Sequence, residues 1–295
     1  MNAETVARAL GGRCRSGRWW RCRCPVHQGK SESLSLRDGD SRLILKCWAG
    51  CTARDVLNEL ARLGLLAGES WPTPVDGDEP YRERDRLDRA RRIANAKDLF
   101  FNESRPAAGT VVERYLVSRG IEIAPPDTIR ASARWLFHSE SGERRLAMLG
   151  LVEHVEYGAV GVHITYLAAD GSGKATIDPA KRLVGVIKGG AVRLGPVVAN
   201  EWLIVGEGIE TTASAMQLWG LPSGWAALSA NGLRRLILPP EPQQIVIAVD
   251  NDVNGVGQAA ARDAAWQWTE AGRTVRIALP PRSGADFNDI LMGAY

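Results

Sequence analysis

The last third of the chain alternates short apolar runs with segments of helical periodicity. Helices are expected through TTASAMQLWG (211–220) and over about 256–271. The apolar runs between and around them predict strands: WLIVGE (202–207), WAALS (225–229), IVIAVD (245–250) and TVRIALP (274–280). Strands that alternate with helices predict a mainly parallel sheet that is covered on both faces.

The middle of the chain has a different texture. AMLGLVEHV (147–155) and GVHITYLA (161–168), followed by the turn-like DGSGK (170–174), predict an antiparallel or mixed sheet over about 145–195. Ahead of this region, a charged helix is expected from Arg82 to about Phe101. A second helix is expected over ERYLVSRGI (113–121), closed by Gly120.

The first 65 residues are expected to fold as a small module of their own. SLSLRDGDSRLILK (33–46) predicts two strands around a DGD turn. Thr52 and Asp55 have the spacing of a capping box that starts a helix. The apolar residues of that helix recur at helical spacing: Val56, Leu57, Leu60, Leu63 and Leu65.

Four possible metal ligands flank this hairpin in two close pairs. They follow the pattern C-x2-H-x19-C-x3-C and are Cys24, His27, Cys47 and Cys51. Zinc prefers four nitrogen and sulfur ligands supplied in this way, so the pattern predicts a structural zinc ribbon. Gly50 would let the backbone turn both sulfurs inward, and Cys14 and Cys22 lie close enough in sequence to serve as alternative ligands.

Composition narrows the class of protein. The 295 residues are enough for two domains, and no stretch approaches 18 consecutive apolar residues, so a membrane span is not expected. The N-terminus lacks the pattern of a secretory signal, and five cysteines do not indicate a disulfide scaffold, so we expect a cytoplasmic protein. The net charge of +3 is modest, but residues 8–23 hold six arginines and no acidic residue.

Acidic residues follow three successive predicted strands of the last third. The carboxyl ends of parallel strands share one edge of a sheet, so these residues are expected to converge there and to bind Mg²⁺ for phosphoryl transfer or cleavage. Taken singly, each acid is more readily explained as a helix cap or an exposed turn residue. The residues are Glu207, Asp250, Asp252, Asp286 and Asp289.

The amino-acid sequences of these segments also resemble those of a known family. VGEGIET (205–211), VDND (249–252) and GADFNDIL (284–291) resemble the three motifs of the Toprim domain, which bacterial primases, topoisomerases and some nucleases share. A Cys-His-Cys-Cys ribbon precedes the region that resembles a Toprim domain, and in this order of parts the chain resembles the bacterial DnaG-type primases. Its sequence is most similar to the plasmid and phage variants of that group. The resemblance covers most of the chain.

The resemblance implies roles for the acids. Glu207 corresponds to the glutamate credited with acid/base or metal work, Asp250 and Asp252 to the pair that binds Mg²⁺ or Mn²⁺, and Asp286 to the acid of the third motif. Two positions depart from the family's pattern, because an aspartate is replaced by Thr211 and an acidic position by Asn288. Fewer carboxylates imply weaker binding of a second or third metal ion.

Basic and aromatic residues are the candidates for contact with nucleic acid. The resemblance implies that the middle region binds nucleotide and template phosphates, through Lys181, Arg182, Lys188 and Arg193. Trp19, Trp20 and Trp48 lie in or beside the ribbon among arginines, where bases of a single strand could stack on them, although Trp48 is equally explained as core of a small domain.

These expectations give an α/β fold within an α+β whole, in four parts. The parts are a zinc-ribbon DNA-binding domain (1–66), a linker with a charged helix (67–109), a mixed-sheet basic primase-core subdomain (110–200) and a Rossmann-like Toprim domain that binds metal and is catalytic (201–295).

Of three functions considered for this sequence, template-directed primer synthesis is favoured. A primase would make short RNA primers on single-stranded DNA from nucleoside triphosphates, in the replication of a plasmid, phage or mobile element. A non-catalytic DNA-binding or recombination-mediator protein would not need the basic middle, and a Toprim nuclease would not obviously need a ribbon. The chain has no G-x-x-x-x-G-K-[ST] motif, so a replicative helicase is expected on a separate chain.

Overall fold

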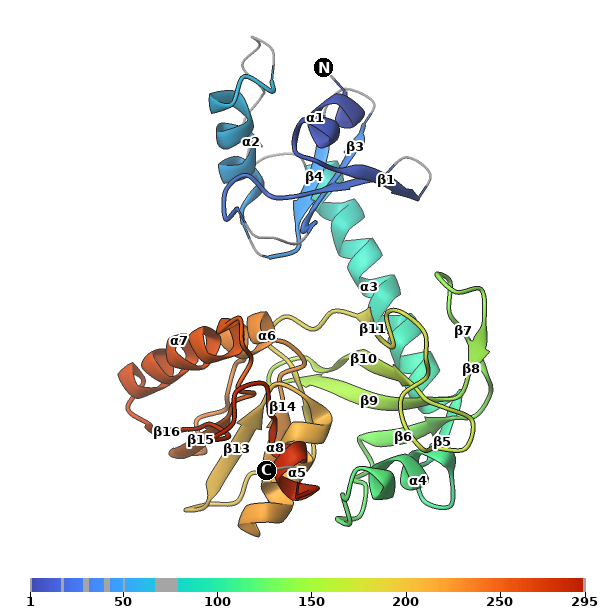
Figure 1. Ribbon diagram of the computed structural model, residues 1–295, viewed down its shortest axis with the longest axis vertical. Helices are drawn as coiled ribbons and strands as arrows, with labels where there is room; N and C mark the ends of the chain where they lie inside the picture. The colour runs from blue at the N-terminus through green and yellow to red at the C-terminus, as the bar shows by residue number, and fades with distance from the viewer. Residues whose placement is uncertain are drawn as a thin grey trace. The chain divides into compact units, whose positions relative to one another are not determined.

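The computed structural model describes residues 2–16, 19–28, 32–39, 43–49, 51–66 and 79–293 (Figure 1). Its contacts divide the chain into an N-terminal unit, residues 1–81, and a C-terminal unit, residues 82–295. The four-part division expected from the sequence stays a prediction. The segment expected to be a linker lies largely outside the described residues, as do Gly50 and the turn residue Asp40.

The N-terminal unit is built on a four-stranded antiparallel sheet in the order β1 (Arg13–Ser16), β2 (Trp19–Cys22), β3 (Leu34–Asp38) and β4 (Leu43–Cys47). Helices α1 (Ala3–Ala9) and α2 (Ala53–Arg62) accompany it. Alternate strand residues face opposite ways, so the side chains of Leu34 and Leu36 reach the same core as Val56 and Leu60. The predicted β3–β4 hairpin is confirmed.

Helix α2 starts where the sequence predicts. The Thr52 hydroxyl accepts a hydrogen bond from the Asp55 backbone N–H at 3.1 Å, which satisfies one free donor of the first turn. The helix ends at Arg62, short of the apolar positions Leu63 and Leu65 that its periodicity included.

The C-terminal unit is organised by one ten-stranded sheet. Its main path runs β11-β10-β9-β12-β14-β13-β15-β16, with β6 also paired to β9 and β5 to β6. The first part is antiparallel and the β14-β13-β15-β16 part is parallel, so the predicted mixed and mainly parallel regions are confirmed as two halves of a single sheet. The strands are β5 (Ser104–Pro106), β6 (Ile129–Ser132), β9 (Ala147–His154), β10 (Gly158–Tyr166), β11 (Lys181–Gly185), β12 (Ala191–Arg193), β13 (Trp202–Gly206), β14 (Gly224–Ala226), β15 (Gln244–Ala248) and β16 (Thr274–Ala278).

The short strand β12 joins the two halves. It pairs antiparallel with β9 on one side, where Val192 is opposite Val152, and antiparallel with β14 on the other, where Val192 is opposite Ala226. At the far end of the sheet, β16 is the last strand of the path, and the Arg276 guanidinium lies over the Trp202 ring at 4.6 Å from its centroid.

Helices cover both faces of this sheet. On β13, Ile204 packs with residues of α5 and α8, whereas its neighbours Leu203 and Val205 pack with α6 and α7. At the antiparallel end, α4 shares the face of α5 and α8, and α3 covers the opposite face (Figure 1). The helices are α3 (Glu79–Phe101), α4 (Val111–Ser118), α5 (Ile209–Trp219), α6 (Ala230–Arg235), α7 (Val256–Glu270) and α8 (Phe287–Leu291).

Helix α3 belongs to the core of the C-terminal unit over its last turns. Ala96 and Phe100 are buried among Leu149 and Val162 of strands β9 and β10. A separate hairpin of β7 (Leu136–Phe137) and β8 (Arg144–Arg145) completes the unit. None of the helices in the described part of the chain combines the length and the apolar composition of a membrane span.

Candidate functional site

The four predicted ligands of the ribbon converge. Cys24 follows β2, Cys47 ends β4 and Cys51 immediately precedes the cap of α2, so two turns and a helix start supply the donors. One donor atom from each of Cys24, His27, Cys47 and Cys51 lies within 4.8 Å of the others. Among the described residues, this is the only group of three or more His, Cys, Asp or Glu that lies so close together.

The donor set and its spacing fit one tetrahedral metal ion. His27 Nδ1 lies 3.1 Å from Cys51 Sγ and 3.7 Å from Cys47 Sγ. Zinc bonds to nitrogen and sulfur place such atoms roughly 3.5 Å apart. His27 Nε2 lies 3.1 Å from Ser33 Oγ, so the proton on Nε2 can be donated to this hydroxyl while Nδ1 faces the sulfurs.

The two alternative thiols are not part of this group. Cys22 is buried in the small core, and this burial, with the nearby Cys24, raises the pKa of its thiol to about 12. Its thiol is not among the donor atoms that converge, and its side chain packs in the hydrophobic core of the unit, so Cys22 is explained as core. Cys14 is exposed on β1.

One face of the ribbon sheet carries aromatic and basic side chains. Strand register places Arg21, Ser35 and Lys46 on one face and Trp20, Leu36 and Leu45 on the other, where the core lies. On the first face, Trp48 is 53% exposed and its indole N–H donates to Ser35 Oγ at 2.8 Å. Cations lie over the exposed rings: Lys46 at 4.2 Å and Arg21 at 5.6 Å from the Trp48 centroid, and Arg37 at 5.1 Å from that of Trp19.

The acids of the parallel half meet at the carboxyl edge of the sheet. Glu207 directly follows β13, and Asp250 and Asp252 lie in the loop after β15. Two backbone hydrogen bonds of Asn251 join this loop to the segment before α8. The Asn251 N–H donates to the Ala285 carbonyl at 2.9 Å, and the Asn251 carbonyl accepts from the Gly284 N–H at 2.6 Å. Those bonds bring Asp286, which caps α8, to the same edge.

Two of these carboxylates lie near Gly257. A Cβ there would lie 3.6 Å from Glu207 Oε2 and 3.8 Å from Asp252 Oδ2, so both carboxylates approach the first turn of α7. Burial and the Asp252 charge raise the pKa of Glu207. Burial also raises the pKa of Asp250 to about 6, aided by the charges of the other three acids and opposed by a hydrogen bond from Thr211.

The structure separates the four predicted phosphate-binding residues. Lys181 and Arg182 are consecutive on β11, opposite Thr165 and Ile164, and therefore point to opposite faces of the sheet. Lys181 lies on the side of the acids, where its charge lowers the pKa of Glu207. Lys188 is exposed, and Arg193 lies over Trp225 and 3.8 Å from Glu153. Strand alternation thus places Lys181 and Arg182 on different faces of the sheet, and phosphate binding by the four residues stays a prediction.

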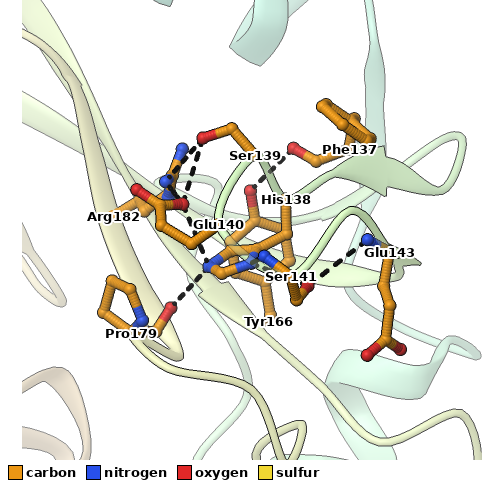
Figure 2. Close-up of polar contacts among 9 residues, drawn as sticks. All are labelled: Phe137, His138, Ser139, Glu140, Ser141, Glu143, Tyr166, Pro179 and Arg182. Atoms are coloured by element: carbon orange, nitrogen blue, oxygen red, sulfur yellow. Dashed lines mark hydrogen bonds and ion pairs between the residues drawn. The ribbon is translucent and has the colours of Figure 1, made fainter. Parts of the chain in front are cut away.

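Arg182 instead belongs to a polar group on the face of α3. Figure 2 shows it beside the loop after β7, where it donates to Ser139 Oγ at 2.9 Å and pairs with Glu140. Behind it, the buried His138 donates from Nε2 to the Pro179 carbonyl at 3.0 Å and accepts at Nδ1 from the Ser141 N–H at 3.1 Å. These contacts fix the loop and hold Arg182 on this face of the sheet.

Comparison with known families now names the parallel half. A model of the Toprim domain matches residues 202–294. Residues 202–294 are a Toprim domain. A second model, described as a domain of unknown function (DUF7146), matches residues 90–194, and the comparison with curated proteins gives no match.

Three solved structures are among those similar to the chain. The primase fragment of the bacteriophage T7 primase-helicase protein is 15% identical, with 65% of this chain and 71% of that chain covered and a TM-score of 0.38. A DNA primase domain from Pseudomonas aeruginosa is 14% identical, with 64% and 57% covered and a TM-score of 0.35. The E. coli primase catalytic core is 14% identical, with 74% and 71% covered and a TM-score of 0.32.

Both departures from the Toprim motifs have a structural role. The Thr211 hydroxyl donates to Asp250 Oδ1 at 3.0 Å, so it holds a carboxylate where the family has another acid. Asn288 is fully buried, and its amide donates to the Arg119 carbonyl at 2.6 Å and to Ser214 Oγ at 2.9 Å. Asn288 therefore ties α8 to α5 and does not face the acids.

Asp286 serves a helix as well as the edge. Its Oδ1 accepts from the Asp289 N–H at 2.8 Å, and Asp289 Oδ2 accepts from the Asp286 N–H at 3.0 Å, which is a reciprocal cap of α8. The helix-cap interpretation therefore holds for this pair, while one oxygen of Asp286 is left for the edge.

Three residues beside the acids were not predicted from the sequence: Glu210, Tyr115 and Lys174. Glu210 is buried in the first turn of α5 and contacts Tyr115 and Lys174 as well as Lys181. An acid in the first turn of a helix ordinarily faces water and complements the helix dipole, so its position in the VGEGIET motif gave no signal of burial.

Removing the ribbon's metal is expected to unfold the N-terminal unit. The purified protein should hold about one zinc per chain, and a strong chelator or Cys47→Ser should remove it and abolish the ordered structure of residues 1–65, since a structural metal supplies folding free energy. Zinc content and circular dichroism measure this. Cys14→Ser is the matched control and should keep its zinc, and an unchanged spectrum after complete removal of zinc would contradict the prediction.

The raised pKa of Asp250 predicts a pH-dependent penalty in magnesium-free buffer. The folded-state pKa of about 6 lies above the ordinary value of 3.8, so ionised Asp250 destabilises the fold above pH 6, and the penalty disappears below about pH 4. Asp250→Asn keeps the acceptor for Thr211 and should raise the free energy of unfolding by about 2 kcal/mol at pH 8 and by nothing at pH 4. Denaturant titrations across this range test it, and parallel pH profiles of the two proteins would refute it.

Proposed function

We propose that the chain is a DNA primase that makes RNA primers on single-stranded DNA by metal-dependent nucleotidyl transfer. The observation that carries the proposal is the convergence of four acids at one edge of the Toprim domain, where Glu207 and Asp252 both approach Gly257 and the loop of Asp250 is hydrogen-bonded to the segment before Asp286. Lys181 lies close enough for its charge to lower the pKa of Glu207. Carboxylates hold divalent metal there and a cation supplies a phosphate contact, which are the elements that phosphoryl transfer needs.

The roles follow from the positions. Glu207, Asp250 and Asp252 would hold Mg²⁺ or Mn²⁺, which when bound activates the primer hydroxyl and neutralises charge on the phosphates. Thr211 keeps one oxygen of Asp250 in place, so that its other oxygen can bind metal. Asp286 completes the edge from the start of α8.

The ribbon is proposed to hold Zn²⁺ and the template strand. Its exposed face offers two tryptophan rings flanked by Arg21, Arg37 and Lys46, and bases of single-stranded nucleic acid stack on such rings while cations contact the phosphates. The other proposed partners are nucleoside triphosphates and, in the cytoplasm, a replicative helicase on a separate chain.

Incorporation of labelled nucleotides on varied single-stranded templates tests the polymerase. With Mg²⁺ or Mn²⁺, wild type should give template-dependent oligomers, and Asp250→Ala should lower their yield by about a hundredfold or more because a metal ligand is lost. Asp88→Ala removes an exposed acid of α3 and serves as the control. Metal-dependent shortening of the template without oligomers would instead establish a nuclease. The absence of both oligomers and shortened template would refute catalysis.

Trp48→Ala tests the template surface separately. Loss of one stacking platform should weaken binding of a labelled single-stranded oligonucleotide by about 1–3 kcal/mol, measured by fluorescence anisotropy at fixed salt. Trp266→Ala removes an exposed tryptophan of α7 and should leave affinity unchanged. Equal affinities of the two variants, with zinc retained in both, would exclude Trp48 from the DNA contact.

A further inference from the structure

Glu210 is a buried carboxylate that three segments of the chain converge on. Only 4% of the residue is exposed. Its Oε1 accepts from the Tyr115 hydroxyl of α4 at 2.6 Å and lies 3.1 Å from Lys174 Nζ, in the loop between β10 and β11. Its Oε2 lies 3.6 Å from Lys181 Nζ on β11. The two ammonium groups and the hydroxyl hold the pKa of Glu210 well below its ordinary range despite its burial.

Such a cluster is not explained by stability alone. Taking charges out of water costs several kcal/mol per ion, and apolar side chains of similar volume often hold a fold equally well. Cations also outnumber the carboxylate, because the Arg119 guanidinium lies close enough to oppose protonation of Lys174. Arg119 Nε is buried and has no hydrogen-bond partner among the described residues. The neighbouring His163 adds no charge at neutral pH, since burial and Lys181 lower its pKa to about 4.

The cluster adjoins the acidic edge of the Toprim domain. Glu210 is followed directly by Thr211, whose hydroxyl donates to Asp250 Oδ1 at 3.0 Å, so the buried carboxylate lies one residue from a direct contact with the edge. The charge of Lys181 also lowers the pKa of Glu207. The lysines are not sealed in, because the side chains of Lys174 and Lys181 are 35% and 41% exposed while that of Glu210 is 5% exposed. The carboxylate thus contacts the ammonium groups on the side that is buried, and the exposed part of each ammonium group stays open to a ligand.

We propose that Glu210 is a positioning residue that holds Lys174 and Lys181 beside the acidic edge, where their ammonium groups bind the phosphate groups of the nucleoside triphosphate. The inference rests on the proposed function for the identity of the nucleotide, and it adds Lys174 and Glu210 to the site. Lys181 keeps the phosphate-binding role expected from the sequence, whereas Arg182 on the opposite face of the sheet has none in this site.

Binding of inorganic tripolyphosphate to the full chain tests the site without any polymerisation. Isothermal titration calorimetry should show binding by wild type, and Lys174→Ala should weaken it by about tenfold, as expected for loss of one charged hydrogen bond. Lys174→Arg should restore most of the affinity. Glu210→Gln keeps the acceptor for Tyr115 but removes the charge that fixes the lysines, so it should weaken binding severalfold and raise the KM for nucleotides more than it lowers kcat.

Matched surface variants and a folding check complete the design. Lys97→Ala on α3 and Glu270→Gln on α7 alter exposed residues and should bind tripolyphosphate as wild type does. Thermal unfolding identifies any variant that fails to fold. If Glu210→Gln does not fold, the comparison of Lys174→Ala with Lys174→Arg still tests the phosphate site. No binding by wild type, or binding by Lys174→Ala equal to that of Lys97→Ala, overturns the inference. The expected binding pattern without primer synthesis would refute the polymerase and leave the phosphate site standing.

Discussion

The C-terminal unit depends on the backbone pairing of a three-residue strand. Strand β12 is hydrogen-bonded antiparallel to β9 on one side and to β14 on the other, so Val192 is in register with Val152 and Ala226 at once. Without this strand the antiparallel and parallel halves would be two sheets. With it, the backbone that carries Lys181 and the strand ends that carry the acids belong to one sheet, and a cation from the middle region reaches the edge of the Toprim domain.

Local patterns explain why so much of this arrangement could be predicted. A parallel strand buried on both faces reads as a continuous apolar run, so β13 and β15 and the acids that follow them could be located from the sequence. The ribbon was similarly accessible, because ligands in two close pairs and the cap at Thr52 are short-range signals. The start of α2 could be predicted for the same reason.

The omissions concern contacts between residues far apart in sequence. That Lys181 faces the side of the acids and Arg182 the side of α3 depends on their partners in the sheet, Thr165 and Ile164 of β10. Glu210 could not be predicted as buried, since Tyr115 is 95 residues away and only the folded sheet brings them together. Asn288 has an acid-like place in its motif, but its partners Arg119 and Ser214 show that it packs inside the unit.

Arg276 has a consequence for the outer boundary of the sheet. Strand β14 has a neighbour on each side, but β16 is the last strand of the described path, and Ile277 on it is 45% exposed. An open, apolar strand edge is a template on which a second chain can add a strand and start aggregation. A guanidinium held over Trp202 places a positive charge on that strand. Pairing with the same edge of another copy would bring like charges onto neighbouring strands, which disfavours that pairing.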